Sequence, residues 1–127
     1  MPRSTTILLL LTLALFSLPS ASAQAVISAR SGMVNFVEGD VHLQGQLVRL
    51  NGAIFPEVKI GQTLSTQAGH AEVLLTPGVF LRLDNNTSFR MISNKLTDTQ
   101  LEILSGSALV EADEILKSNR ITVKMGD

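Results

Sequence analysis

The sequence predicts an all-β domain, and three observations carry that prediction. Glycines recur at intervals of six to nine residues from Gly32 to Gly78. Between them, β-branched and aliphatic residues alternate with polar ones, as in strands that have one buried face. Outside residues 108–116, no stretch keeps a helical period. Turn signals at this spacing indicate many short strands, arranged as a β-sandwich or as a β-roll or solenoid.

Residues 1–23 have the pattern of a secretory signal peptide. Residues 7–18 are apolar, and Ala21 and Ala23 supply the small side chains that signal peptidase requires, which places cleavage before Gln24. A helix over this apolar run spans roughly 18 Å, less than the ~30 Å of a bilayer core. We therefore expect a helical, cleavable signal peptide and a periplasmic or secreted product without a stable membrane anchor. An uncleaved anchor is the alternative.

Composition narrows the function classes. The 127 residues contain no cysteine, which excludes disulfides, thiolate metal sites and cysteine nucleophiles. Residues 1–23 hold one of the ten basic residues and none of the eleven acidic ones. Residues 24–127 therefore carry nine basic and eleven acidic side chains, a net charge of −2. That balance gives no electrostatic reason to expect nucleic acid as a partner. After a short linker over 24–31, residues 32–127 are expected to form one domain.

The first strands of that domain are expected on either side of a turn. Val34 and Phe36 should share one face, and residues 38–40 (Glu-Gly-Asp) should turn the chain. Val41 and Leu43 should then resume on one face of the next strand.

The middle of the chain has the clearest alternation. Turns are expected at residues 77–78, 84–86 and 105–107, each of which contains Gly, Asn or Asp. The side chains expected to face the core between these turns are Ala71, Val73, Leu75, Val79, Leu81, Leu83, Phe89, Met91, Leu101 and Ile103.

The end of the sequence is less regular. Residues 108–116 fit either a short helix or the end of a strand. Residues 120–125 alternate as a strand, directly before the last residue, Asp127. We therefore expect the domain to be incomplete at its C-terminus and its strand edges to be open to pairing.

Four stretches, at residues 32–41, 60–73, 78–87 and 101–110, carry glycines and hydrophobic positions in an order that resembles the FecR domain family. The resemblance implies a periplasmic or cell-surface β domain that serves signal reception or protein interaction and not catalysis. A role in sigma-factor regulation is not predicted, because no cytoplasmic anti-sigma segment or transmembrane helix is recognised in this sequence.

The most polar cluster is residues 84–87 (Asp-Asn-Asn-Thr). It fits a β-turn in which Asx side chains bond to their own backbone, and a calcium loop or a glycan acceptor is the alternative. His42 and His70 are the two histidines, and their spacing does not fit a zinc site, so surface positions are expected. No serine carries a nucleophile motif.

Charged residues offer two further candidates. Glu111, Asp113 and Glu114 could serve acid–base or metal chemistry, and a solvated turn or helix face is the simpler interpretation. Arg82 and Arg90 are expected on the outer side of the sheet, as a face for an anionic partner or as scattered surface cations.

The sequence thus predicts a non-enzymatic module with no catalytic, cofactor or metal site, and an unknown protein of the cell envelope as its partner. A structural protein associated with the cell wall or its polysaccharides is the alternative. The absence of Trp and Tyr weighs against sugar binding, because sugar faces usually stack on those rings.

Overall fold

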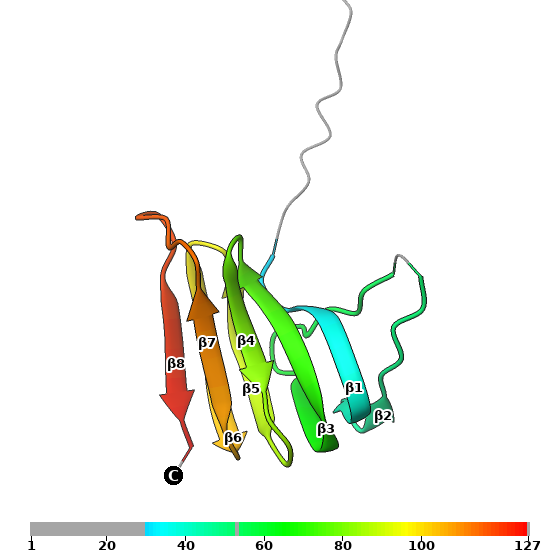
Figure 1. Ribbon diagram of the computed structural model, residues 1–127. Coiled ribbons are helices and arrows are strands. Elements are labelled where there is room, and N and C mark those ends of the chain that lie inside the picture. The colour runs from blue at the N-terminus through cyan, green and yellow to red at the C-terminus, as the bar shows by residue number, and fades with distance from the viewer. Residues whose placement is uncertain (1–29, 53, 127) are drawn as a thin grey trace, which may run out of the picture.

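The computed structural model describes residues 30–52 and 54–126 (Figure 1). These residues form eight β-strands and no helix, so the all-β prediction is confirmed, and none of them belongs to a helix that could cross a membrane. The predicted signal peptide, with Ala21, Ala23 and Gln24, lies outside the described residues. The strands are β1 (Met33–Leu43), β2 (Gln46–Leu47), β3 (Thr63–Thr76), β4 (Val79–Leu83), β5 (Ser88–Lys95), β6 (Asp98–Ser105), β7 (Ala108–Ala112) and β8 (Ile121–Met125).

All eight strands belong to one open, mixed sheet. Its main path runs β2-β1-β3-β5-β6-β8, and β4 joins β3 to β7. Every pair is antiparallel except β6 and β8, which run parallel.

Strand β3 makes the sheet fold over on itself. On one side it pairs with β1, and on the other its residues 63–65 pair with β5 while its residues 71–76 pair with β4. The two halves of β3 therefore start two different layers. Figure 1 shows β4 and β7 in front of β5 and β6. We call these the front layer (β4 and β7) and the back layer (β5, β6 and β8).

One hydrophobic core fills the space between the layers. The inward positions of β3, β4, β5 and β6 are buried, because they alternate with outward positions along each strand. All ten side chains that the sequence predicts as core in this region are buried. The cluster consists of Val34, Val41, Val48, Val58, Leu64, Ala71, Val73, Leu75, Val79, Leu81, Leu83, Phe89, Met91, Leu101 and Ile103.

The predicted turn at residues 38–40 is wrong. Strand β1 continues through Gly39 to Leu43, and β3 continues through Gly69, so both strands are longer than the glycine spacing suggests. Gly39 is paired with Gly69, and the register shifts between Gly39 and Val41. A glycine in a strand often marks a bend or a close approach of two backbones and not a turn, and that is its role here.

Val34 and Phe36 do not share a face. The register shifts between them, so that Val34 pairs with Val73 of the inner face and Phe36 with Glu72 of the outer face. The extra residue of this bulge, Asn35, rotates the rest of the strand. Phe36 is therefore exposed, whereas Val34 is buried.

The three turns predicted in the middle of the chain are confirmed. Gly78, Asn86 and Gly106 have positive φ angles of 79°, 52° and 84°, as tight turns require. Residues 108–112 form β7, so the helical alternative for 108–116 is wrong.

Residues directly before the first strand are tied into the core. Ser31, in the predicted linker, is fully buried. Its N–H donates to the carbonyl oxygen of Asn94 at 2.9 Å, and its Oγ lies 2.7 Å from Thr99 Oγ1 and donates to the carbonyl oxygen of Leu75. This network joins the start of the domain to β3, β5 and β6.

Candidate functional site

The polar residues 84–87 form a turn whose hydrogen bonds stay within the domain. Asp84 Oδ1 accepts the N–H of Asn85 at 2.7 Å. Thr87 is buried, and its Oγ1 lies 3.0 Å from the carbonyl oxygens of Asn85 and Ser107 and accepts the N–H of Ser107 at 3.0 Å. The turn interpretation is confirmed. No group of three metal-ligating side chains gathers in the part of the chain that the structure describes.

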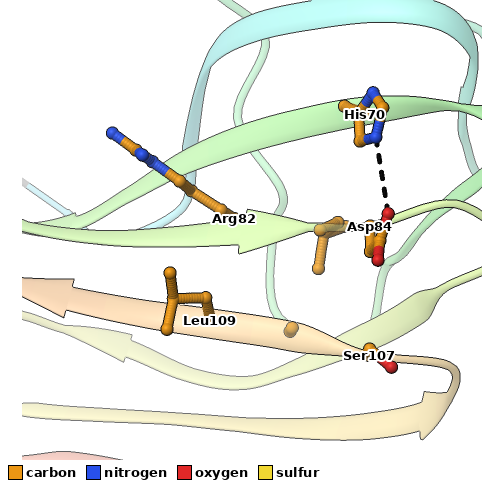
Figure 2. A pocket seen from close by; sticks show the side chains of 7 residues that line it. His70, Arg82, Asp84, Ser107 and Leu109 are labelled. Atoms are coloured by element: carbon orange, nitrogen blue, oxygen red, sulfur yellow. Dashed lines mark ion pairs between the residues drawn. The ribbon is translucent and has the colours of Figure 1, made fainter.

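A shallow hollow of about 310 Å³ lies beside this turn. Figure 2 shows its side chains on β3, β4 and β7 and, for Asp84 and Ser107, on the residues directly after β4 and before β7. His70 Nε2 lies 3.4 Å from Asp84 Oδ1, and both side chains are more than half exposed. His42 lies elsewhere, on β1 opposite Ser65. The lining residues are His70, Arg82, Leu83, Asp84, Ser107, Ala108 and Leu109.

This hollow contains a histidine, a carboxylate and a serine, but not in the order that a nucleophilic triad needs. In a triad the histidine lies between the carboxylate and the nucleophile. In Figure 2, Asp84 lies between His70 and Ser107, and the side chain of Ser107 points away from His70. The three groups are therefore not arranged to activate Ser107.

The two arginines of the sheet are each paired with carboxylates. Arg82 on β4 contacts Glu72 of β3 through Nε and Glu111 of β7 through Nη2, both at 3.0 Å. Arg90 Nη2 contacts Glu102 Oε2 at 2.6 Å. Both arginines are exposed, as the sequence predicts. Because their charges are already balanced by neighbours, they do not form a cationic face for an anionic partner.

The acidic group after Val110 is divided by the fold. Glu111 lies on β7 and is held by Arg82, whereas Asp113 and Glu114 lie exposed in the loop that follows. The solvated interpretation fits these positions.

No family model, curated protein or solved structure matches this chain. The resemblance to FecR domains therefore stays a prediction from the four sequence stretches.

The most unusual part of the molecular surface is the edge where both layers end, at β7 and β8. Strands paired side by side place directly opposite residues on the same face, so β7 continues the inner face of β4, and β8 continues that of β6. Leu81 is fully buried, but its partner Val110 is 39% exposed. Likewise Leu101 is fully buried and its partner Val123 is 38% exposed.

Among the strands of residues 30–52 and 54–126, none covers the core at this edge. Ile103 is 3% exposed, whereas its β8 partner Met125 is 69% exposed. Seven of the thirteen exposed large hydrophobic side chains in the described residues lie between residues 104 and 125. They are Leu104, Leu109, Val110, Ile115, Leu116, Val123 and Met125. We call β7 and β8, with their inward residues, the open edge.

The backbone of β7 is also available at the open edge. The N–H of Asp113 donates to Gly78 at 2.9 Å, and the carbonyl oxygen of Ser107 accepts from Asp84 at 3.1 Å, so odd-numbered residues of β7 point their backbone groups at β4. In an antiparallel ladder this direction alternates along the strand. The backbone groups of Ala108, Val110 and Ala112 therefore point to the free side, where no other described strand pairs with β7.

The sequence predicts open strand edges but does not identify the residues that line them. The available signal is the alternation of apolar residues in 108–112 and 121–125. Their common orientation depends on the pairing of β7 with β4 and of β8 with β6, which no local pattern reveals.

Proposed function

We propose that this protein is an exported, non-catalytic interaction module of the bacterial cell envelope, and that the open edge is the surface on which it meets its partner. The exposure of Val110, Val123 and Met125 beside fully or almost fully buried neighbours carries the proposal. Contiguous apolar surface of this kind on a soluble protein marks an interaction site.

Two further observations support an interaction by strand pairing. The free backbone groups of β7 can bind an extended segment by β-augmentation, in which main-chain hydrogen bonds give affinity. The exposed inward side chains Val110, Val123 and Met125 can then contact alternate side chains of that segment. The signal peptide predicted over residues 1–23 and the resemblance to FecR domains support a location in the periplasm or outside the cell.

The test is photo-crosslinking inside the cell in which the protein is exported. A photoreactive phenylalanine analogue replaces Val110 in one variant. In a control variant it replaces Arg49, an exposed residue just after β2, the strand at the other end of the sheet order. We expect adducts from position 110 and far fewer from position 49. Mass spectrometry then identifies the captured chain.

Each outcome bears on the proposal. Adducts that form at position 110 and not at position 49 support it, whether the captured chain is another protein or a second copy. If position 110 gives no adduct of any kind while the folded variant accumulates outside the cytoplasm, the open edge is not an interaction surface.

A further inference from the structure

We propose that the open edge binds a single extended segment of another protein, antiparallel to β7, in which apolar residues alternate with lysine or arginine. This inference rests on the proposed function and states the chemistry of the partner at the same edge. Three features of the described residues carry it: the unequal width of the two layers, the free backbone groups of β7 and the charges of the front layer.

The back layer is one strand wider than the front layer. Counted from β3, the front layer ends at its second strand, β7, whereas the back layer continues past β6 to a third strand, β8. Figure 1 shows β8 beyond β7 at this end of the sheet. The position beside β7 therefore lies over β8, about 10 Å from it. One strand fits there, but a folded partner with a second layer behind its edge strand would collide with β8.

The free backbone groups of β7 define how this strand pairs. The N–H and carbonyl groups of Ala108, Val110 and Ala112 point to the free side, so each of these residues exchanges two hydrogen bonds with the residue opposite it in an antiparallel pair. Both pairs of the front layer, β3 with β4 and β4 with β7, are antiparallel. The added strand continues the same ladder.

This pairing turns alternate side chains of the segment toward the core. Residues opposite Ala108, Val110 and Ala112 share their face and point inward, over the exposed Val123 and Met125 of β8. Two of the three inward residues of β7 are alanines, whose small side chains leave room for larger apolar residues opposite them. A shift by one residue would turn the charged side chains of the segment inward. The inward positions of the segment are therefore apolar.

The front layer is acidic on the side where the other side chains of the segment lie. Residues 79–85 and 108–114, which comprise β4, β7 and the two residues after each, contain four carboxylates and one base. That base, Arg82, already contacts two carboxylates. In the part of the chain that the structure describes, no ion pair is formed by Asp113 or Glu114. Basic side chains on the segment complement this charge.

Asp113 continues the outer face of β7. Its N–H donates to the carbonyl oxygen of Gly78 at 2.9 Å, so it keeps the direction of Leu109 and Glu111. A lysine or arginine opposite Asp113 meets an exposed carboxylate, and one opposite Leu109 lays its aliphatic stem on an exposed side chain. The bases that follow in the sequence, from Lys117 onward, belong to the loop toward β8 and to β8 itself.

The size of the contact sets the expected strength. A five-residue strand is roughly 17 Å long, and such an edge is smaller than the ~800 Å² per partner of a standard interface. We therefore expect reversible binding with a dissociation constant in the micromolar range. The affinity should fall as salt is added, because the charges that select the segment are exposed.

The experiment measures the fluorescence anisotropy of a short labelled peptide, in which valine and lysine alternate, with the exported chain purified in the form that the cell delivers. N-methylation of the valines removes the N–H groups that face β7, and N-methylation of the lysines removes only those on the far side. We expect the unmodified and the lysine-methylated peptides to bind, and the valine-methylated peptide not to bind. A peptide with glutamate in place of lysine should bind at least about tenfold more weakly.

Matched variants of the chain locate the site. Val110→Lys places a charge on the inner side of the edge, and Leu109→Lys places the same charge one residue away on the outer side. Both repel a basic peptide, so we expect a loss of affinity about tenfold larger for Val110→Lys, which also removes the inward apolar contact. Asp113→Asn should weaken binding about two- to fivefold. Asp40→Asn, at an exposed residue of β1, should leave it unchanged. Circular dichroism checks that all variants are folded.

The outcomes separate this inference from the proposed function. If no peptide binds, or if the glutamate peptide binds as tightly as the lysine peptide, the stated chemistry of the partner is wrong, whereas photo-crosslinks from position 110 would keep the proposed function. Binding that survives methylation of the valines but not of the lysines would overturn the antiparallel direction. A concentration-dependent dimer of the unmodified chain that Val110→Lys abolishes in sedimentation velocity would assign the edge to a second copy and also overturn the inference.

Discussion

Gly39 of β1 and Gly69 of β3 face each other where the sheet folds into two layers. A Cβ on Gly39 would overlap the carbonyl oxygen of Ala68, and one on Gly69 would overlap that of Glu38. The two backbones therefore approach as closely as only glycine permits. Strands that pass from one layer to another do so at bends and bulges of this kind.

The first prediction tests this crossing. In Gly69→Ala the added methyl would also lie 2.7 Å from the backbone nitrogen of Asp40, so one strand has to shift. We expect the free energy of unfolding to fall by about 2–3 kcal/mol, as in other overpacked sites. Gly45→Ala is the control, because Gly45 has open space but a φ of 78°, and it should cost about 1 kcal/mol. Urea unfolding measures both, and an equal effect would contradict the close-approach argument.

The second prediction concerns the turn that holds the two layers at their common end. Thr87→Val keeps the shape but removes the acceptor of the Ser107 N–H. The hydrogen bonds of this hydroxyl are partly buried, and a typical hydrogen bond contributes about 0.5–1.5 kcal/mol, so we expect a loss of about 1–1.5 kcal/mol in thermal or urea unfolding. Ser88→Ala removes only an exposed hydrogen bond to Ser105 and should change stability by about 0.5 kcal/mol or less. If both variants are equally stable, the Thr87 network is not structural.

Local alternation predicted the core of β3 to β6 because each of these strands has one face on the core and one outside. It failed at β1 for two physical reasons. A bulge at Asn35 reversed the faces of Val34 and Phe36, and Gly39 served close approach where a turn was expected. Such features depend on the partner strand, which is distant in sequence.

The same limit applies to the candidate sites. The polar turn at 84–87 was predictable because Asx turns are made of local hydrogen bonds. The contact of His70 with Asp84, 3.4 Å apart, and the exposure of Val110 both depend on which strands lie side by side. In particular, β8 pairs in parallel with β6, although β7 lies between them in the sequence. The alternation of apolar residues within either strand does not indicate this pairing.

The third prediction tests whether the charged outer face stabilises the fold. Arg82→Gln removes ion pairs to Glu72 and Glu111. Because the arginine side chain is about half exposed, we expect a loss of about 1 kcal/mol or less that shrinks as salt is added. Arg49→Gln is the control, since no ion pair to Arg49 is found in residues 30–52 or 54–126. A loss that does not change with salt would mean that packing, not charge, holds Arg82.

The fourth prediction concerns export. If residues 1–23 are a signal peptide, mass spectrometry of the exported protein should find Gln24 at its N-terminus. Ala23→Arg should block processing, because signal peptidase accepts only small residues at that position. Ser22→Arg is the matched control, since the position between the two small residues tolerates larger side chains. An exported protein that retains its first 23 residues would favour the uncleaved anchor.

The last prediction separates the interaction module from the wall-associated alternative. Sugar-binding faces usually combine aromatic rings with hydrogen-bonding side chains, and this chain has five Phe but no Trp or Tyr. Phe36 is 47% exposed, on the outer face of β1, while Phe89 is fully buried in the core. We therefore expect the exported protein to stay in the supernatant when purified peptidoglycan is sedimented, at low and at high salt. Phe36→Ala serves as the second arm: co-sedimentation that this variant abolishes, while Val110→Lys leaves it intact, would move the functional surface from the open edge to the outer face of β1.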